Sequence, residues 1–482
     1  MKNLIIFSLL IPFLVNCQPQ KQKDNWISLF DGASLDGWKA NENEGTWTVK
    51  DGTIVCEGER SHLFYTGDVN GGIFKNFEFK ADVKTMPGSN SGIYIHTEYQ
   101  NEGWPDKGYE VQVNNSFIGN PEQPELKKTA GLYGIRNKYL TTVNDNEWFT
   151  MLIVVKGNRV QINVNDQLVT DYTEPDDAYR TEEWKNRVLD KGTFALQGHD
   201  PLSVVYYKNI EIKPLADDAQ FEKEQRRLDR ELERKITKLH TQGFPIMDLH
   251  VHLKGDLTMD EALAQSRYKG IDYGIAVNCG KADDFPVNND QELLDYIKTV
   301  NQVPAFNAMQ AEGREWVDIF SMDAVKTFDY VFSDAMTFID KDGNPAQMWK
   351  QDHVDRIDLS DPEIFMDKLV DYIVQILNDE PIDIYVNATY LPDVIVEQYD
   401  VLWTEERMSK VIQAAIDNEV AIEISARLKM PSYTFIKLGR EMGVKFTFGT
   451  NNIDSQLGNL DYCLIAIDSC GLTTPDMWVP GY

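Results

Sequence analysis

The sequence predicts two domains of different fold class, an antiparallel β-sandwich followed by a parallel β/α barrel. The chain has 482 residues, which is more than one ordinary hydrophobic core holds. From about Trp26 to Leu215, apolar residues recur with a period near two between turn residues, as in antiparallel strands. From about Gln242 to Tyr482 the pattern changes to a repeated order of strand, loop and helix, which is typical of a parallel barrel.

The composition excludes one class of partner. Hydrophobic residues make up 42% and charged residues 26% of the chain, as in soluble globular proteins. The 47 basic residues against 77 acidic ones leave a net charge of −30. Because nucleic-acid surfaces need clusters of Lys and Arg to displace counterions, we expect no nucleic-acid partner. The oligomeric state stays open.

The first residues have the pattern of a targeting signal. Lys2 precedes an apolar run from Leu4 to Val15, which is long enough for a signal-peptide core and too short to span a bilayer. The run leads into Asn16-Cys17 and resembles a bacterial lipoprotein signal, in which the cysteine is lipidated. We therefore expect a signal peptide at residues 1–17 and a polar tether at 18–25. The lipid on Cys17 would hold the protein on a membrane of the cell envelope, in the periplasm or on the cell surface.

The other four cysteines are Cys56, Cys279, Cys463 and Cys470. They are scattered over both predicted domains without a paired pattern. We predict buried thiols, with one disulfide left open because an exported protein meets an oxidising compartment.

The predicted sandwich, residues 26–215, begins with a β-hairpin. Thr46–Lys50 and Thr53–Val55 flank Asp51-Gly52, a pair that two-residue hairpin turns favour. Further strands are predicted at Phe77–Val83, Gly92–Thr97, Tyr109–Val113, Phe149–Lys156, Arg159–Val164 and Val204–Ile212. Many short strands with Gly and Asn turns favour two packed antiparallel sheets.

Several phrases in this segment carry a family resemblance. They are Leu29-Phe30-Asp31-Gly32, Leu35-Asp36-Gly37-Trp38, Ser91-Gly92-Ile93-Tyr94, Gly108-Tyr109-Glu110-Val111-Gln112 and Phe194-Ala195-Leu196-Gln197-Gly198-His199. With them the segment resembles the domain once called DUF1080, a concanavalin-like jelly roll named as a 3-keto-disaccharide hydrolase, or 3-keto-glucoside lyase and hydratase. The resemblance implies a jelly-roll sandwich and a carbohydrate substrate, an oxidised (3-keto) glycoside.

The chemistry that this resemblance implies defines the side chains to look for. A ketone at C3 of a sugar acidifies the proton at C2, so a base can remove that proton and expel the substituent at C1. Water then adds to the unsaturated sugar. The reaction needs a general base, an acid for the leaving oxygen, and a charged or metal partner for the enolate.

Alternation along the strands selects the candidates in the sandwich. Three pairs of residues each share one face of a strand: Tyr94 with His96, Glu110 with Gln112, and Gln197 with His199. We expect the two histidines and Glu110 to be catalytic and the other three residues to bind the substrate.

An alternative gives the sandwich a binding role alone. Jelly rolls of this type also serve as carbohydrate-binding modules, in which aromatic side chains stack on sugar rings. Trp38, Trp104 and Tyr133 are the candidate platforms. All catalysis would then belong to the second domain.

Residues 216–241 form a charged connector between the domains. Glu, Lys, Arg and Gln dominate this stretch, with acid and base pairs at helical spacing such as Glu231 with Lys235. We predict a solvated helix that joins the domains at a semi-rigid distance.

The barrel, residues 242–482, is predicted from seven strands and the helices between them. The strands are Ile246–His252, Tyr273–Asn278, Pro304–Gln310, Tyr330–Ser333, Ile384–Asn387, Ala421–Ser425 and Lys445–Gly449. The helices include Met259–Ser266, Asp290–Val300, Asp361–Asn378, Glu405–Asn418 and Ser432–Met442. The chemistry of such barrels sits at the carboxyl ends of the strands.

The first barrel strand carries the strongest local pattern. In Met247–His252 the side chains of Asp248, His250 and His252 fall on one face, where two imidazoles and a carboxylate suit zinc, manganese or iron. The alternative is a pair of histidines without a ligand. Polar residues also follow the other strands, so the predicted site does not depend on this strand alone.

The barrel segment resembles the PHP family of polymerase-and-histidinol-phosphatase-like metal hydrolases, a distorted barrel that opens with a His-x-His strand. His250 and His252 match the opening ligands, and Glu312 stands where a bridging carboxylate is expected. The chain departs from the family at Asn278-Cys279 and at Gly449-Thr450-Asn451-Asn452, where other ligands would stand. Because of these departures we expect one or two divalent ions, held by His250, His252, Glu312 and Asp334, with Glu423 as a further candidate ligand; a barrel without metal is the alternative.

Two arginines complete the predicted barrel site. Glu312 and Arg314 are the expected catalytic residues, and Arg427 and Asn451 are expected to bind the substrate. The guanidinium groups favour a substrate with an anionic or carboxylate-like group.

Together these features favour an exported, lipid-anchored enzyme of carbohydrate metabolism. The sandwich would act on 3-keto glycosides by hydrolysis or by lyase and hydratase chemistry, and the barrel would add a metal-assisted step. A second hypothesis leaves binding to the sandwich and gives the barrel a phosphoester, amide or lactone to hydrolyse. A third is a surface glycan-binding lipoprotein without catalysis.

Overall fold

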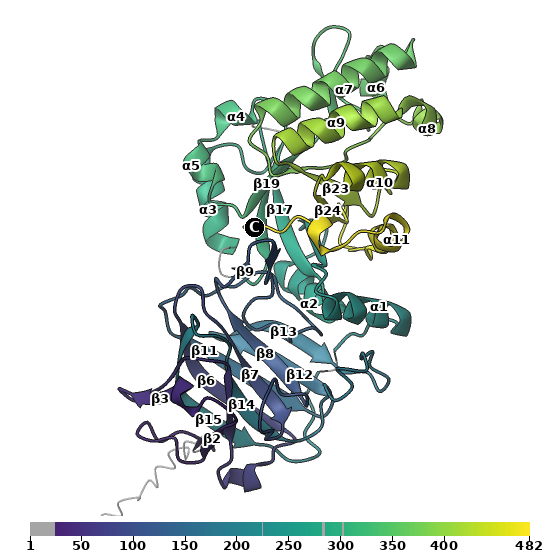
Figure 1. Ribbon diagram of the computed structural model, residues 1–482. Helices are drawn as coiled ribbons and strands as arrows, with labels where there is room; N and C mark the ends of the chain where they lie inside the picture. The colour runs from purple at the N-terminus through teal and green to yellow at the C-terminus, as the bar shows by residue number, and fades with distance from the viewer. Residues whose placement is uncertain (1–24, 224, 282–284, 301–302) are drawn as a thin grey trace, which may run out of the picture.

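The N-terminal half of the chain consists of two antiparallel β-sheets. The structure, a computed structural model, describes residues 25–223, 225–281, 285–300 and 303–482, so Cys17 and the predicted signal peptide lie outside the described residues. One sheet has eight strands in the order β13-β12-β11-β6-β15-β4-β3, with β1 paired to β15, and the other has the order β2-β5-β14-β7-β8. The two sheets form the lower part of the molecule in Figure 1.

The strands of the larger sheet are β1 (Ile27–Ser28), β3 (Trp47–Lys50), β4 (Thr53–Glu57), β6 (Phe77–Thr85), β11 (Phe149–Lys156), β12 (Arg159–Val164), β13 (Gln167–Thr173) and β15 (Val204–Pro214). Those of the smaller sheet are β2 (Trp38–Ala40), β5 (Ser61–Tyr65), β7 (Asn90–Thr97), β8 (Tyr109–Asn114) and β14 (Thr193–Gly198). A short hairpin, β9 (Gly119–Asn120) and β10 (Gln123–Pro124), stands apart from both.

The core of this half lies between the sheets, which makes it a β-sandwich. Along β6 every second side chain is buried, as expected for a strand with one solvated face. The ring of Phe194 in the smaller sheet stacks on Phe79 of the larger sheet at 4.7 Å and meets Phe77 edge-on at 4.9 Å. The sandwich class predicted from the period-two pattern is therefore confirmed.

The predicted hairpin is present. Trp47–Lys50 pairs with Thr53–Cys56, and Asp51 and Gly52 have φ values of 51° and 76°. Both turn residues thus adopt the left-handed conformation that this type of hairpin turn requires. The prediction missed β5 and β13 as strands, and β5 carries a residue of the site described below.

The C-terminal half is a nearly closed barrel of seven parallel strands. The strands follow each other in chain order: β16 (Met247–His252), β17 (Asp272–Cys279), β18 (Phe306–Ala311), β19 (Tyr330–Ser333), β22 (Ile384–Tyr385), β23 (Ala421–Ser425) and β24 (Phe446–Gly449). The first and last strands meet where Asn451 N donates to His250 O at 2.8 Å. The parallel β/α barrel predicted from the strand and helix repeat fits this arrangement.

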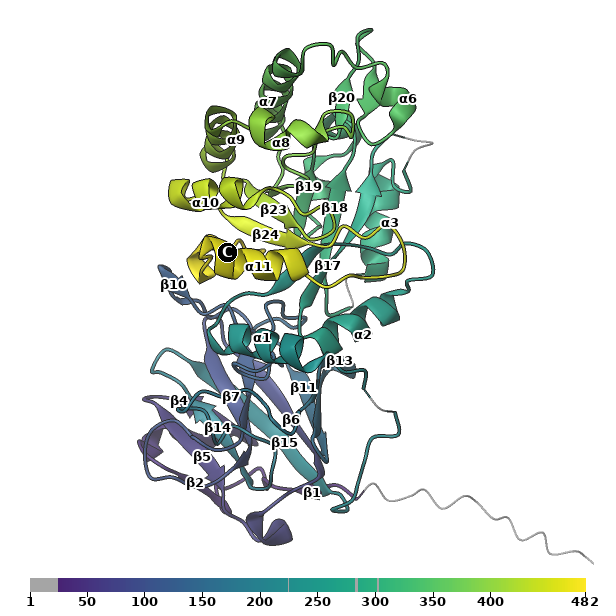
Figure 2. The ribbon, with the colours of Figure 1, turned by 90° about the vertical axis from the view of Figure 1, so that its right-hand side faces the viewer.

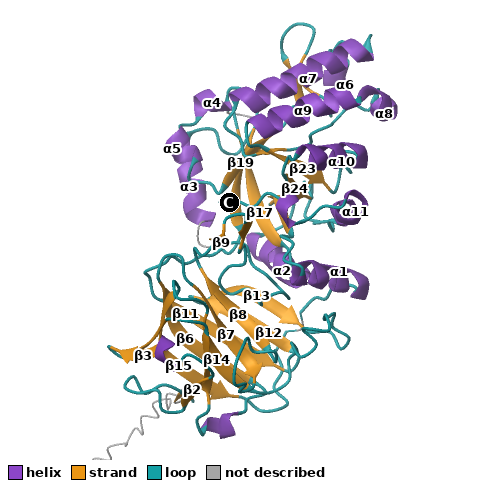
Figure 3. Cartoon of the chain, in the orientation of Figure 1, coloured by secondary structure: helices purple, strands orange, loops and turns teal. Residues whose placement is uncertain are grey.

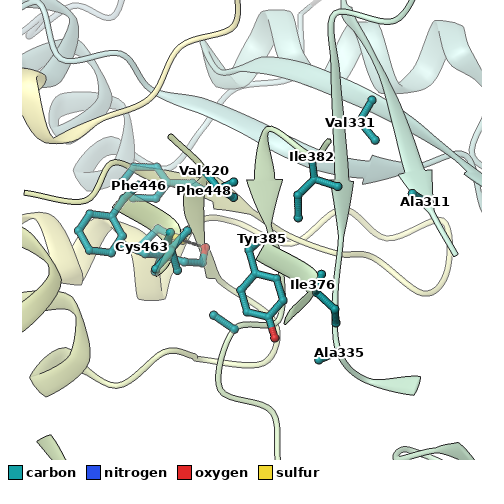
Figure 4. Packing of buried hydrophobic residues seen from close by; sticks show 14 of the residues in the cluster. Ala311, Val331, Ala335, Ile376, Ile382, Tyr385, Val420, Phe446, Phe448 and Cys463 are labelled. Carbon is teal, nitrogen blue, oxygen red and sulfur yellow. Dashed lines mark hydrogen bonds between the residues drawn. The ribbon is translucent and has the colours of Figure 1, made fainter. Parts of the chain in front are cut away.

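Helices surround the barrel, as Figure 3 shows in purple. They are α2 (Met259–Lys269), α3 (Asp290–Val300), α4 (Trp316–Ile319), α5 (Met322–Val325), α6 (Gln351–Val354), α7 (Pro362–Asp379), α8 (Tyr399–Leu402), α9 (Glu405–Asp417), α10 (Tyr433–Met442) and α11 (Asp461–Cys470). A small hairpin, β20 (Thr337–Ile339) and β21 (Pro345–Gln347), precedes α6. Apolar faces of strands and helices share one buried cluster, part of which Figure 4 shows around Phe446, Phe448 and Cys463.

The sandwich packs against the amino ends of the barrel strands. The connector ends in helix α1 (Arg230–Thr241), and the sandwich loop before Leu140 contacts both α1, through Arg136 and Glu233, and the barrel. Tyr139 Oη donates to Phe244 O at 2.9 Å, and Lys138 Nζ lies 2.6 Å from Asp272 Oδ1. Tyr139 is 2% exposed and belongs to a buried cluster with Leu249 from the barrel interior. The two halves therefore share a buried apolar contact. Figure 2 shows α1 and α2 lying beside the sandwich at this junction.

Two further features concern the cysteines and the length of the helices. Cys56, Cys279, Cys463 and Cys470 are buried free thiols, as predicted. Among the described helices, none combines the length and the apolar character needed to cross a bilayer.

Candidate functional sites

The carboxyl ends of the barrel strands hold a buried pair of histidines. His250 Nδ1 lies 2.6 Å from Glu423 Oε1, and both side chains are 1% exposed. His252 Nδ1 lies 3.2 Å from Ala276 O. The Nε2 atoms of both histidines are buried without a hydrogen-bond partner among the described residues. Such atoms are costly unless a ligand completes their bonding, so this end of the barrel is a candidate site.

The predicted acidic groups lie near these rings but have their own partners. Asn278 Nδ2 donates to Glu312 Oε1 at 2.7 Å, and Asn387 Nδ2 donates to Asp334 Oδ2 at 2.9 Å. Burial, with a smaller contribution from the Asp334 charge, raises the pKa of Glu312 to about 7. Burial also raises the pKa of Asp334.

The two arginines of the predicted barrel site bind other groups of the protein. Arg314 pairs with Glu380 at 2.8 Å and donates through Nη2 to Ser333 Oγ at 2.9 Å. Arg427 Nε donates to Asn451 O at 2.5 Å. Arg427 and Asn451 thus lie together at the site, whereas Arg314 turns toward the helix side.

Asp248 does not join the histidines, which corrects the alternation prediction for the first barrel strand. The pairing of β16 with β17 shifts register between Asp248 and Val251, so the alternation is interrupted. Both oxygens of Asp248 accept hydrogen bonds from Thr450, at 2.9 Å from N and 2.8 Å from Oγ1. This carboxylate joins the first strand to the segment after the last one.

The donor set at this end does not assemble into a metal site in the described part of the chain. No three His, Cys, Asp or Glu side chains there are placed to hold one metal ion. The free Nε2 atoms of His250 and His252 supply two nitrogen donors, but Glu312 and Asp334 do not converge on them. We derive no metal-assisted step from these residues, and the divalent ion stays a prediction.

A second cluster covers the outer face of the smaller sandwich sheet. Strand pairing aligns two rows across four strands, one of His62, Gln197, Gly92 and Gln112, and the next of Phe64, Ala195, Tyr94 and Glu110. Their sequence neighbours, such as Leu63 and Val111, belong to the sandwich core on the other face. Alternation therefore gathers polar side chains on the face opposite the core.

Glu110 is the buried acid of this cluster. Tyr94 Oη donates to Glu110 Oε2 at 2.8 Å, and Gln197 Nε2 donates to Oε1 at 2.8 Å. Burial raises the pKa of Glu110, and the charge of Arg187 opposes this shift. Gly92 is required beside it, because a Cβ atom there would lie 2.7 Å from Glu110 Oε1.

Several buried polar atoms around Glu110 have no hydrogen-bond partner in the described structure. They are both ring nitrogens of His62, Oε1 of Gln112, Oε1 of Gln197 and Nη1 of Arg187. Native proteins leave few such atoms, and here they gather on one sheet face. The arrangement indicates a site whose ligand offers several hydrogen-bond donors and acceptors.

Aromatic side chains border the cluster. The ring of Trp104 lies 5.3 Å from His62 and 5.4 Å from His199, and Trp104 is 41% exposed. His199 Nδ1 lies 2.7 Å from Asp200 Oδ2. An exposed indole beside unpaired polar groups suits the apolar face and the hydroxyl groups of a sugar.

Residues 25–213 match the family model described as a 3-keto-alpha-glucoside-1,2-lyase-like domain. A curated relative, the 3-keto-disaccharide hydrolase of Bacteroides thetaiotaomicron, is 28% identical over 31% of this chain. The alignment spans 59% of the length of that relative. The assignment of the sandwich as a carbohydrate-active domain thus rests on sequence similarity.

Solved structures are similar to the same half of the chain. A protein of Parabacteroides distasonis named as a candidate glycosyl hydrolase is 24% identical, covers 40% of this chain and 94% of its own, and has a TM-score of 0.34. The carbohydrate-binding module CBM66 of Bacillus subtilis is 14% identical, covers 37% and 95%, and has a TM-score of 0.25.

The structure brings five of the six predicted residues of the lyase-like domain to one face or its border. Tyr94, Glu110, Gln112 and Gln197 lie in the two rows, and His199 lies just beyond the end of β14. Gln112 Nε2 donates to Asn90 Oδ1 at 2.8 Å, so only its oxygen is free.

His96 lies elsewhere, which corrects its pairing with Tyr94. Its φ of 54° breaks the alternation of β7 and turns the ring against Phe77 of the other sheet, at 5.5 Å. His96 Nε2 lies 2.8 Å from Lys75 O, and Asp190 N donates to Nδ1 at 3.1 Å. Burial lowers the pKa of His96 to about 4. Both ring nitrogens of His96 therefore have backbone partners, and the ring does not join the cluster around Glu110.

Trp38 is part of the core and not a sugar platform. It is 7% exposed, donates through Nε1 to Leu29 O at 2.7 Å and packs edge-on against Tyr65. The exposed Trp104 remains a candidate platform of the lyase-like domain.

Sequence reasoning missed His62 and Arg187. His62 lies in β5, a five-residue strand that is buried on both faces, so its sequence shows little alternation of polar and apolar residues. Arg187 comes from the irregular segment before β14, where the sequence holds no periodic signal.

Proposed function

We propose that the sandwich domain acts on oxidised (3-keto) glycosides, by lyase and hydratase chemistry that amounts to hydrolysis. One observation carries the proposal: the buried Glu110 carboxylate lies among polar atoms that lack partners. The family match over residues 25–213 and the name of the curated relative support the substrate class.

Glu110 would serve as the general base. Its carboxylate takes the C2 proton, and the C–H electron pair moves toward the C3 carbonyl to give an enolate. When the ketone re-forms, a C1=C2 double bond forms and the C1–O bond breaks, and the leaving oxygen receives a proton as an alcohol. Water then adds its hydroxyl to C1 and a proton to C2. Tyr94 and Gln197 orient the carboxylate through their hydrogen bonds.

A substitution of Glu110 tests this function. We expect Glu110→Gln to lower kcat on a 3-keto glucoside by about 100-fold or more, because the amide cannot accept the C2 proton. Release of the aglycone by the full-length chain is the measurement. Glu78→Gln, in an ion pair on the larger sheet, is the matched control. Equal rates for wild type and Glu110→Gln would contradict the assignment.

The glycan-binding alternative predicts a different result for the same proteins. A binding module would hold unoxidised glycans through the exposed Trp104 and would leave 3-keto glucosides intact. Binding without turnover in the wild-type chain would therefore favour the alternative.

The barrel is a second candidate site because His250 and His252 each hold a buried Nε2 without a partner at the strand ends. We propose a separate hydrolytic role for it, on a phosphoester, amide or lactone. Metal analysis of the purified chain beside His250→Ala tests whether a divalent ion takes part. Equal metal content in both proteins would exclude His250 as a ligand.

We also propose that the protein is exported and held on a membrane through Cys17. The proposal rests on the sequence of residues 1–17. Cys17→Ala should move the protein out of the membrane fraction, and an unchanged distribution would contradict the anchor.

A further inference from the structure

Arg187 is a buried cation beside Glu110 without an acidic partner. It is 8% exposed, and its guanidinium lies 4.3 Å from the ring of Trp184 and 5.9 Å from that of Tyr133. Nη1 has no hydrogen-bond partner, and no ion pair joins this side chain to a carboxylate in the described structure. A buried charge of this kind is costly unless an anion meets it.

Three other basic groups around the cluster are paired with acids. Arg60 pairs with Glu42 at 3.0 Å, Lys127 with Glu125 at 2.8 Å, and His199 with Asp200 at 2.7 Å. Burial lowers the pKa of His62 to about 3, so its ring is uncharged at neutral pH. Arg187 thus differs from these groups, because in the described structure it is a buried cation without an acidic partner.

The charge of Arg187 acts on the carboxyl group of Glu110. After burial, the charge of Arg187 is the largest influence on the pKa of Glu110, although the two groups form no ion pair. Tyr133, beside Arg187, is joined to Glu110 through its backbone N–H, which donates to Glu110 O at 2.9 Å. The base and the cation are therefore close enough to interact, and neither neutralises the other through an ion pair.

The segment that carries Arg187 is braced. Arg187 N donates to Trp184 O at 2.9 Å, and Arg180 Nε donates to Arg187 O at 2.5 Å. Gly134 allows Trp184 to pack against the backbone, because a Cβ atom at this position would overlap the indole. A braced cation is preorganised for charge that develops during a reaction.

We propose that Arg187 binds the C3 oxygen of the 3-keto sugar and stabilises the negative charge that this oxygen acquires when Glu110 removes the C2 proton. The inference rests on the proposed function and names the enolate-binding residue. It also predicts a preference for oxidised sugars, because a C3 hydroxyl group never acquires this charge. The electron pair of the C2–H bond ends on the C3 oxygen beside the guanidinium, and the proton ends on Glu110.

Proton exchange isolates this step from departure of the aglycone. The probe is a carbocyclic 3-keto sugar analogue, which has no leaving group at the position of C1, incubated with the full-length chain in D2O. NMR follows the loss of the C2 proton signal. We expect Arg187→Met to slow this exchange, and kcat on a 3-keto glucoside, by about 100-fold, the usual effect of losing one oxyanion donor. Arg187→Lys should fall in between, because it keeps the charge without the planar fork.

Controls separate the possible failures. Binding of an unoxidised glucoside, followed by tryptophan fluorescence, should change less than threefold in Arg187→Met. Arg230→Met, at an exposed ion pair on α1, is the matched loss of an arginine. If both Arg187 variants exchange and turn over within threefold of wild type while Glu110→Gln is inactive, the inference fails and the proposed function stands. If wild type shows neither exchange nor cleavage, the proposed function fails and takes the inference with it.

Discussion

At the scale of single residues, the sandwich site places a buried carboxyl group among polar atoms, several of which have no hydrogen-bond partner in the described structure. Glu110 accepts hydrogen bonds from Tyr94 and Gln197, yet burial still raises the pKa of Glu110. Removing a carboxylate from water disfavours its charged form, and two hydrogen bonds offset only part of that cost. The site therefore holds a stronger base than an exposed glutamate.

The pH dependence of the reaction follows from this shift. Glu110 must be ionised to take a proton, so kcat/KM should fall as the pH decreases through a pKa above the ordinary glutamate value of 4.5. The pH dependence of folding has the opposite sign: the folded state holds this proton more tightly than the unfolded one, so stability decreases as pH rises through that window. A pH profile of kcat/KM on a 3-keto glucoside is the measurement. An acid limb below 4.5 would contradict the assignment of Glu110 as the base.

Residue placement could be predicted only where the backbone keeps its strand geometry. Alternation placed Tyr94, Glu110, Gln112 and Gln197 correctly. It failed at His96, because a positive φ in a histidine is set by the surrounding structure and leaves no mark in a period-two pattern.

At the scale of elements, the site depends on how closely neighbouring strands lie. Gly92 in β7 stands between Gln197 of β14 and Gln112 of β8, and its missing side chain leaves space for the carboxylate of Glu110. Strand β7 thus provides the space for the Glu110 carboxylate at Gly92 as well as the side chain of Tyr94.

Filling this opening should disable the site without unfolding the sheet. Gly92→Ala would place a methyl group 2.7 Å from Glu110 Oε1, so the carboxylate must move. We expect kcat/KM on a 3-keto glucoside to decrease by about tenfold or more, since small displacements of a catalytic group are costly. Gly45→Ala, where a Cβ atom would meet nothing within 4 Å, is the control. Unchanged activity in Gly92→Ala would mean that the position of the carboxylate does not matter.

Elements with strong local signals were predictable. Asp51-Gly52 marked the first hairpin, and the helices from Asp290, Glu405 and Ser432 begin within a residue of their predicted starts. Strand β5 was missed because Ser61–Tyr65 is short and buried on both faces, which weakens the alternation of polar and apolar residues.

At the scale of the whole molecule, the sandwich forms the floor of the barrel. Tyr139 and Leu126 from the sandwich share a buried cluster with Leu249 and Phe332 from inside the barrel. The connector does not act as a spacer alone, because Arg136 pairs with Glu233 of α1 at 2.6 Å. No local pattern predicted this contact, since its residues are distant in the sequence and ordinary in composition.

The shared floor should couple the unfolding of the two domains. Tyr139→Ala removes a buried aromatic ring at a cost of about 3 kcal/mol or more, so the melting temperature of the whole chain should decrease. Differential scanning calorimetry is the measurement, with Tyr206→Ala on the outer face of the larger sheet as the control. Two separate transitions, with the barrel transition unchanged by Tyr139→Ala, would show that the domains unfold independently.

The contact of the sandwich with the amino ends of the barrel strands has a consequence for two consecutive reactions, one on each domain. His250 and His252 lie toward the carboxyl end of β16, whereas the sandwich contacts the amino ends of the strands at Phe244 and Asp272. The candidate site of the barrel therefore lies on the side turned away from the sandwich. A product made on one domain would have to leave, mix with the medium and be recaptured by the other. An added enzyme that consumes this product should therefore remove all of it before the second domain can act. Direct transfer of the product between the two sites would protect part of it.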